Sequence, residues 1–314
     1  MADSDSTRTE VDRRVAPADA FGAIANETRL AILRALWEAP ERPVSFSELR
    51  ASVGMRDSAQ FNYHLRQLTD HFVRKTDEGY SLRAAGKGVV RALVVGTFTE
   101  DPRRDPFPVG SDCVHCGEPL HAHYADESLT VDCTACERVH SRHPFPPGGL
   151  FGRDDDALLD AYERWVRGQY ALVAAGICPV CGSELRTELV TDTDRFSEDG
   201  TASACRFPEY DTVVLATCDR CIRRVGATVG MRLLSASAVA EFYRDHGLDL
   251  ATIPYWELPW AVSDRHTTVL NDDGGTTDPW RVCVTIPLDD EVLRVTLDRD
   301  FDIVSTDRLG QEPV

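Results

Sequence analysis

The chain of 314 residues is longer than one hydrophobic core usually organises, so we expect two or three compact units. Its formal net charge of -18 argues against a basic surface of the kind that binds nucleic acid, but this charge is unevenly spread. Residues 1–96 carry 14 Arg and Lys against 13 Asp and Glu, a net of +1, which leaves -19 for the rest.

The composition also bears on where the protein works. The N-terminus is polar and acidic, and no apolar run approaches the length of a membrane-spanning helix, so we predict a cytoplasmic protein with no membrane partner. Lysine occurs only at Lys75 and Lys87. An acidic chain that uses Arg in place of Lys is typical of halophilic archaea, in which a heavily charged surface maintains solubility.

Short helices are predicted for the N-terminal part of the chain. After a disordered N-terminus over 1–15, one helix begins at Pro17 and a second is capped by Asn26. A third, shorter helix carries a capping box, in which Ser45 and Glu48 satisfy each other's backbone amides.

The next helix is predicted within DSAQFNYHLRQLTDHF, where apolar residues recur at helical spacing. VRKTDEGYSL then indicates a two-stranded hairpin, and RAAGKGVVRALVVGTF a closing helix. Helix, helix, short helix, helix, hairpin and helix is the order of a winged helix-turn-helix domain, which we place at 16–98.

The sequence of this segment resembles that of the ArsR-type winged helix of prokaryotic transcription regulators, above all in NETRLAIL, YHLRQL and GYSLRAAG. The resemblance implies a sequence-specific regulator of transcription that binds double-stranded DNA as a homodimer, with GKGVVRALVVGTF as a contact surface. Many ArsR relatives sense metals through cysteines in the helix before the recognition helix. SFSELRASVG has no cysteine, so metal sensing of that type is not expected here.

A recognition helix presents short and medium polar side chains to base edges and phosphates. Such a set is present on the fourth predicted helix, in the turn before it and in the hairpin. The alternative interpretation is an ordinary solvated helix face. In that case His64 would pack beside the apolar stripe. In molar salt, counterion release contributes little, so we predict a shallow dependence of DNA affinity on salt. The predicted DNA contacts are Arg56, Ser58, Gln60, Asn62, Tyr63, His64, Arg66, Arg74, Lys75 and Arg83.

Residues 99–110, rich in proline and charge, are predicted to be a linker, and four CxxC pairs follow it. Without an export signal, metal-bound thiolates are favoured over disulfides. Each CxxC places two sulfurs on one tight knuckle, and two knuckles close a tetrahedral zinc site. Whether the knuckles close within each block or across the two blocks stays open. We predict about two structural Zn2+ ions, with the ligands Cys113, Cys116, Cys133, Cys136, Cys178, Cys181, Cys218 and Cys221.

The rest of the chain divides around these cysteines. We assign a first zinc ribbon to 111–146, an amphipathic helix to 154–176, a second zinc ribbon to 177–232, and a helix plus an antiparallel β-meander to 233–314. The predicted fold class is therefore α+β and multidomain: a winged helix-turn-helix, two four-cysteine zinc-ribbon-like units, a bridging helix and a C-terminal meander.

The other Cys residues and the nearby His residues are not expected to bind a metal ion. Cys205 is expected as a free thiol in the long loop of the second ribbon, and Cys283 in a buried or edge strand. The histidines near the first block are expected on the surface rather than as ligands. They are His115, His121, His123, His140 and His143.

We predict no enzyme, because the sequence has no Gly-rich phosphate loop, nucleophile elbow, HExxH or deaminase pattern. A regulator with structural zinc is the favoured function, with a small-molecule or protein effector acting through the C-terminal region. One alternative is a protein similar to the archaeal general transcription factor related to eukaryotic factor E, which joins a winged helix to a zinc ribbon and contacts RNA polymerase. Another is a zinc-ribbon scaffold for protein partners.

Overall fold

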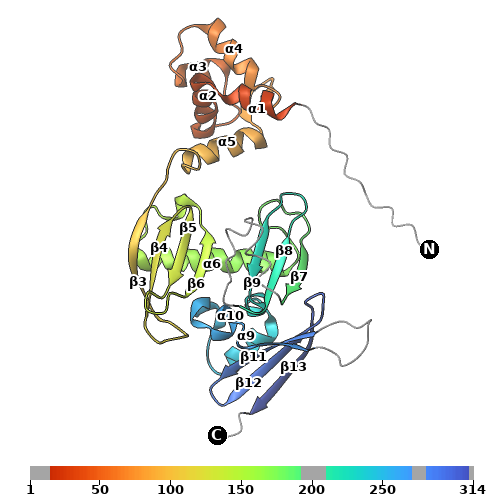
Figure 1. Ribbon diagram of the computed structural model, residues 1–314. Helices are drawn as coiled ribbons and strands as arrows, with labels where there is room; N and C mark the ends of the chain where they lie inside the picture. The colour runs from red at the N-terminus through yellow and green to blue at the C-terminus, as the bar shows by residue number, and fades with distance from the viewer. Residues whose placement is uncertain (1–14, 192–209, 271–280, 311–314) are drawn as a thin grey trace, which may run out of the picture. The chain divides into compact units, whose positions relative to one another are not determined.

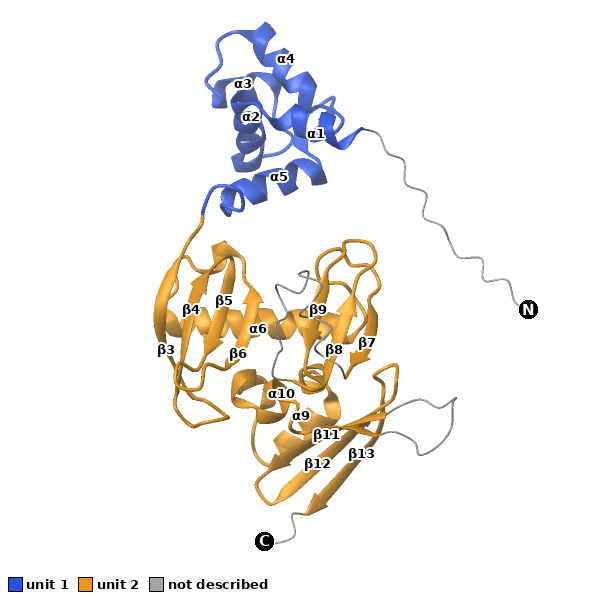
Figure 2. Cartoon of the chain, viewed as in Figure 1, with its two compact units in different colours: residues 1–100 blue, residues 101–314 orange. Residues whose placement is uncertain are grey.

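The computed structural model describes residues 15–191, 210–270 and 281–310. The chain divides into two compact units, residues 1–100 and 101–314, which Figure 2 shows in different colours. The fold is mixed α+β, with several antiparallel sheets (Figure 1). Within the described ranges, no helix combines the length and the apolar character needed to cross a membrane.

The first unit has the predicted order of helices and hairpin. Its identification as a winged helix-turn-helix domain stays a prediction. The disordered N-terminus predicted over 1–15 falls outside the described residues, apart from Val15. The elements are α1 (Pro17–Ile24), α2 (Glu27–Glu38), α3 (Phe46–Ser52), α4 (Ser58–Leu68), β1 (Val73–Thr76), β2 (Gly79–Leu82) and α5 (Ala84–Val94).

Side-chain caps start the helices where the sequence predicts them. The Asn26 side chain accepts a hydrogen bond from the amide of Arg29 at the start of α2. Ser45 and Glu48 form both halves of the capping box at α3. These caps satisfy amides that the first turn of a helix leaves without a partner, and the two predictions are confirmed.

Backbone pairing extends the hairpin of the first unit beyond β1 and β2. Val44 and Tyr80 exchange two backbone hydrogen bonds of 2.9 and 2.8 Å, so the segment before α3 lies against β2. Gly79 makes this approach possible: a Cβ atom there would lie 2.4 Å from the carbonyl oxygen of Val44. The local sequence pattern does not predict this pairing.

The second unit contains three antiparallel sheets, joined by helices (Figure 1). The first sheet has the order β3-β4-β5-β6, the second β7-β8-β9 and the third β10-β11-β12-β13. The strands are β3 (Arg104–Asp112), β4 (Pro119–Ala125), β5 (Ser128–Asp132), β6 (Val139–Pro144), β7 (Arg186–Val190), β8 (Val213–Thr217), β9 (Arg224–Ala227), β10 (Thr267–Leu270), β11 (Arg281–Leu288), β12 (Glu291–Leu297) and β13 (Ile303–Gly310). The helices are α6 (Asp155–Ala174), α8 (Val229–Leu233), α9 (Ser237–Asp245) and α10 (Pro259–Val262), with 3-10 turns η1 (Pro147–Gly149), η2 (Leu250–Thr252) and η3 (Tyr255–Glu257).

The structure corrects the predicted linker at 99–110, because β3 begins at Arg104 and takes up most of that segment. The prolines Pro106 and Pro108 suggest a linker from sequence. They are tolerated here because β3 is the edge strand of its sheet, where a missing amide donor breaks few ladder bonds.

Helix α6 connects the first two sheets of the second unit. The Tyr162 hydroxyl donates to the carbonyl of Leu129 on β5, at 2.9 Å, and the Tyr170 hydroxyl to that of Gly226 on β9, at 3.0 Å. One hydrophobic core runs from Phe107 to Phe301. The segments predicted as separate C-terminal domains therefore belong to one compact unit.

Candidate metal centres and nucleic-acid face

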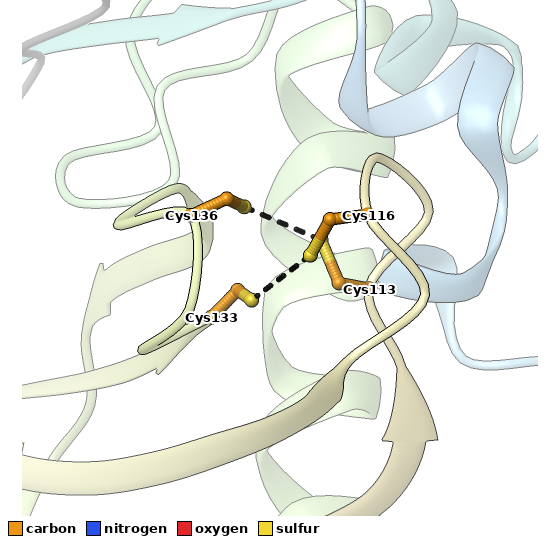
Figure 3. Close-up of side chains that lie close together, drawn as sticks. All are labelled: Cys113, Cys116, Cys133 and Cys136. Carbon is orange, nitrogen blue, oxygen red and sulfur yellow. Dashed lines mark hydrogen bonds between the residues drawn. The ribbon is translucent and has the colours of Figure 1, made fainter.

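The first four-cysteine cluster lies between two knuckles of the β3–β6 sheet. Cys113 and Cys116 come from the turn between β3 and β4, and Cys133 and Cys136 from the turn between β5 and β6; Figure 3 shows the four side chains converging. The Sγ atoms of Cys113 and Cys136 lie 3.7 Å apart, and those of Cys116 and Cys133 lie 3.5 Å apart.

The second cluster repeats this arrangement around β7, β8 and β9. Its sulfur pairs, Cys178 with Cys221 and Cys181 with Cys218, are each separated by 3.6 Å. In each cluster the four sulfurs lie within 4.8 Å of one another. The CxxC knuckles therefore close within each block and not across the two blocks.

Both clusters fit a tetrahedral metal with thiolate ligands. A Zn–S bond of about 2.3 Å requires sulfurs about 3.8 Å apart in a tetrahedron, and the observed pairs are close to this spacing. Backbone hydrogen bonds hold the knuckles: the amide of Cys113 donates to the carbonyl of Glu118 at 2.8 Å, and that of Cys178 to Ser183 at 2.7 Å. The two clusters could therefore each hold a metal ion without rearrangement.

The thiols within a cluster differ in acidity. Hydrogen bonds from the hydroxyl and amide of Ser183 lower the pKa of Cys181 to about 6. The amide of Glu118 lowers the pKa of Cys116, but burial and the three neighbouring sulfurs outweigh it and raise that pKa to about 12. Four thiolates at this spacing repel one another, so a divalent cation is what allows all four to ionise.

The structure corrects the prediction that the histidines of the first block lie on the surface. His140 is buried, and the other four are half-buried. Nε2 of His140 lies 3.2 Å from Sγ of Cys113, a distance at which a neutral imidazole can donate a hydrogen bond to a thiolate. Burial is the main cause that lowers the pKa of His140 to about 4 and so keeps this ring neutral. None of the histidines belongs to either group of four convergent ligands among the described residues.

Two further cysteines were singled out by the sequence. Cys283 lies buried on the inner strand β11, as predicted. Cys205 lies outside the described residues.

Helix α4 of the first unit has one buried and one polar face. Phe61, Leu65 and Leu68 are buried against the core of the first unit. Because successive residues of a helix are about 100° apart, Tyr63 and Arg66 lie near the centre of the opposite face. Tyr63 is 60% exposed there.

The predicted DNA contacts divide into exposed and engaged side chains. Arg56, Ser58, Gln60, Asn62, Tyr63 and Arg66 are exposed around α4, and Arg74 and Lys75 are exposed on β1. His64 is half-buried, with its ring against that of Tyr63. Arg83 is also half-buried and donates a 2.6 Å hydrogen bond to the carbonyl of Asp70, so it holds the turn before the hairpin.

Sequence reasoning missed Gln67, which is exposed on the same face as Tyr63 and Arg66. It lies between Leu65 and Leu68 in the sequence but points away from both around the helix, so the helical spacing alone could have identified it.

Fold and sites together define an α+β protein of two units, the second of which carries two four-cysteine clusters. Residues 110–303 match the family described as Domain of unknown function (DUF7351), and residues 17–93 match Domain of unknown function (DUF7347). Because the first match covers more than half of the chain, the chain belongs to the DUF7351 family. No curated protein matches the sequence.

Proposed function

We propose that this protein is a sequence-specific DNA-binding regulator of transcription, with a winged helix-turn-helix in its first unit. The observation that carries the proposal is the outward face of α4. This face bears polar side chains and an exposed tyrosine, whereas the opposite face of the helix packs into the core. The exposed hairpin residues Arg74 and Lys75 add two cations for phosphate contacts. The resemblance to ArsR-type regulators supports the same function and a homodimer.

The net charge of the first unit also favours DNA binding over that of the second unit. Residues 1–100 carry 14 Arg and Lys against 14 Asp and Glu, whereas residues 101–314 carry 20 against 38. The first unit therefore repels a phosphate backbone far less than the second unit does.

Selection of bound duplexes from a random DNA library tests the proposal, followed by affinity measurements on the enriched sequence. Asn62→Ala and Arg66→Ala should each weaken binding by about tenfold or more, because a base contact contributes about 1–3 kcal/mol. Arg34→Ala removes a similar charge from an exposed position of α2, outside the predicted DNA contacts, and serves as the matched control. A library without any enriched sequence would contradict the proposal.

Genome-wide occupancy separates a regulator from a basal factor that contacts RNA polymerase. Discrete, palindromic sites support a dimeric regulator, and signal at every active promoter supports the basal factor.

We further propose that each four-cysteine cluster holds one structural Zn2+ ion. Four thiolates form a closed site without a position for substrate, which suits a stabilising metal rather than a catalytic one. Metal analysis of the purified protein should give two zinc equivalents, and a value below two would contradict the assignment.

A further inference from the structure

The two clusters share a local sequence pattern that allows their residues to be compared one by one. CVHCGEPL at Cys113 corresponds to CPVCGSEL at Cys178, and CTACERV at Cys133 to CDRCIRR at Cys218. His115 therefore corresponds to Val180, and Glu137 to Ile222. We call these positions, which lie between or directly after the cysteines, the knuckle tips.

The chain itself covers part of the knuckle tip of the first cluster. Val114 and Cys136 pack against the large core of the second unit. The ring of His115 lies 5.5 Å from that of His140, and the Ser111 hydroxyl donates to the carboxylate of Glu257, in η3. His115 is therefore half-buried, whereas Glu137 is exposed, and Val139, three residues after Cys136, is 48% exposed.

The knuckle tip of the second cluster is open within the described residues. Ile222 is 84% exposed and Val180 is 68% exposed. The neighbouring Ile177, just before the first knuckle, is 41% exposed. Three aliphatic side chains next to one metal site thus leave apolar surface exposed to water.

Ile222 also has a backbone conformation that disfavours it. Its φ of 54° lies in the left-handed region, as does the 59° of the corresponding Glu137. A β-branched side chain is disfavoured there, and it costs more than Asn or Gly would. An isoleucine that is both strained and exposed suggests that its side chain has a task outside the fold.

The charge around this tip differs from that of the unit that carries it. Residues 177–186 and 217–225 contain four arginines against two carboxylates, a net of +2, in a unit whose own net charge is -18. Arg220, between the cysteines of the second knuckle, is exposed. A partner with carboxylates would be attracted to this surface and repelled by most of the remaining unit.

We propose that the knuckle tip of the second cluster, Val180 and Ile222 with Arg220 beside them, is the docking surface for a protein segment that presents an apolar side chain flanked by carboxylates. Nucleic acid is a poorer match, since phosphates gain nothing from two exposed aliphatic side chains. This inference does not depend on DNA binding by the first unit.

A displayed library of short random peptides, selected on the metal-loaded full-length protein, tests the proposal. Retained peptides should share an aliphatic or aromatic residue with Asp or Glu around it. Ile222→Asn should weaken their binding by about tenfold or more, as truncation of a central apolar contact does. Glu137→Asn places Asn at the corresponding tip of the first cluster and should leave binding unchanged.

The Ile222→Asn variant is expected to keep its fold, because Asn tolerates the left-handed conformation. Its Tm and its metal content should equal or exceed those of the parent protein. The proposal is overturned if no peptide is enriched, if the enriched peptides lack the acidic and apolar pattern, or if Ile222→Asn binds them as well as the parent does. It is also overturned if Ile222→Asn loses affinity for the selected DNA, since this tip would then belong to the DNA interface. Loss of DNA binding in α4 variants alone leaves it intact.

Discussion

The two four-cysteine clusters have the same internal geometry and different surroundings. Cys113 and Cys133 of the first cluster belong to the hydrophobic core that runs from Phe107 to Phe301. The second cluster has a small core of its own, in which Val173, Leu185 and Ala216 surround its buried cysteines. The same ligand set thus lies in the large core of the unit in one place and in a small local core in the other.

Removal of one buried ligand from each cluster should have the largest effect and should separate these two roles. Cys133→Ser is expected to lose one metal and to unfold most of residues 101–314, because a structural zinc contributes about 10 kcal/mol or more, comparable to the stability of a whole domain. Cys218→Ser is expected to lose one metal too, with loss of order confined to β7, β8 and β9. Metal analysis together with hydrogen exchange along the chain measures both effects.

Cys283→Ser provides the control for this pair, because Cys283 is buried but belongs to neither cluster. It should retain both metals. If Cys218→Ser removed amide protection as widely as Cys133→Ser did, the distinction between the two clusters would be wrong.

His143 lies on β6, with its ring against helix α6, and predicts an effect of acid. Its ring contacts Tyr170 at 5.4 Å between centroids, and burial, followed by the charge of Arg223, lowers its pKa to about 4. As the pH falls below the ordinary value of 6.5, the unfolded chain takes up a proton here that the folded chain refuses. Stability is therefore complete above about pH 6.5 and is lost as the pH falls towards 4, by up to about 3 kcal/mol.

The variant His143→Gln cannot titrate, so its free energy of unfolding should fall less between about pH 7 and pH 4.5. Chemical denaturation of both proteins at the two pH values measures this difference. Protonation of the cysteines weakens metal binding in both proteins and cancels in the comparison. An equal decline in both would show that His143 does not couple acid to stability.

The features that the sequence predicts are those in which partners are close along the chain. Asn26 caps an amide three residues away, and each CxxC knuckle closes over a few residues. The apolar stripe of α4 likewise follows from spacing alone. The eight convergent cysteines could therefore be identified without a structure.

Features made by distant segments could not be predicted in this way. The pairing of Val44 with Tyr80 depends on how the first unit closes. The burial of His140 depends on packing of the large core. Arg83 looks like a phosphate contact from its charge, whereas its guanidinium reaches the carbonyl of Asp70. A charge pattern shows which groups are available, and only packing shows which are already engaged.

The smallest expected effect compares the two knuckle tips directly. Ile222→Asn replaces a β-branched residue in the left-handed region by one that accepts it, so the second unit should gain about 0.5–1 kcal/mol. Glu137→Asn relieves less, because Glu is not β-branched. Thermal unfolding of the metal-loaded proteins should therefore give Ile222→Asn the higher Tm of the two. A lower Tm for Ile222→Asn would mean that the isoleucine stabilises the fold, and its exposure at the open tip would no longer indicate a task outside it.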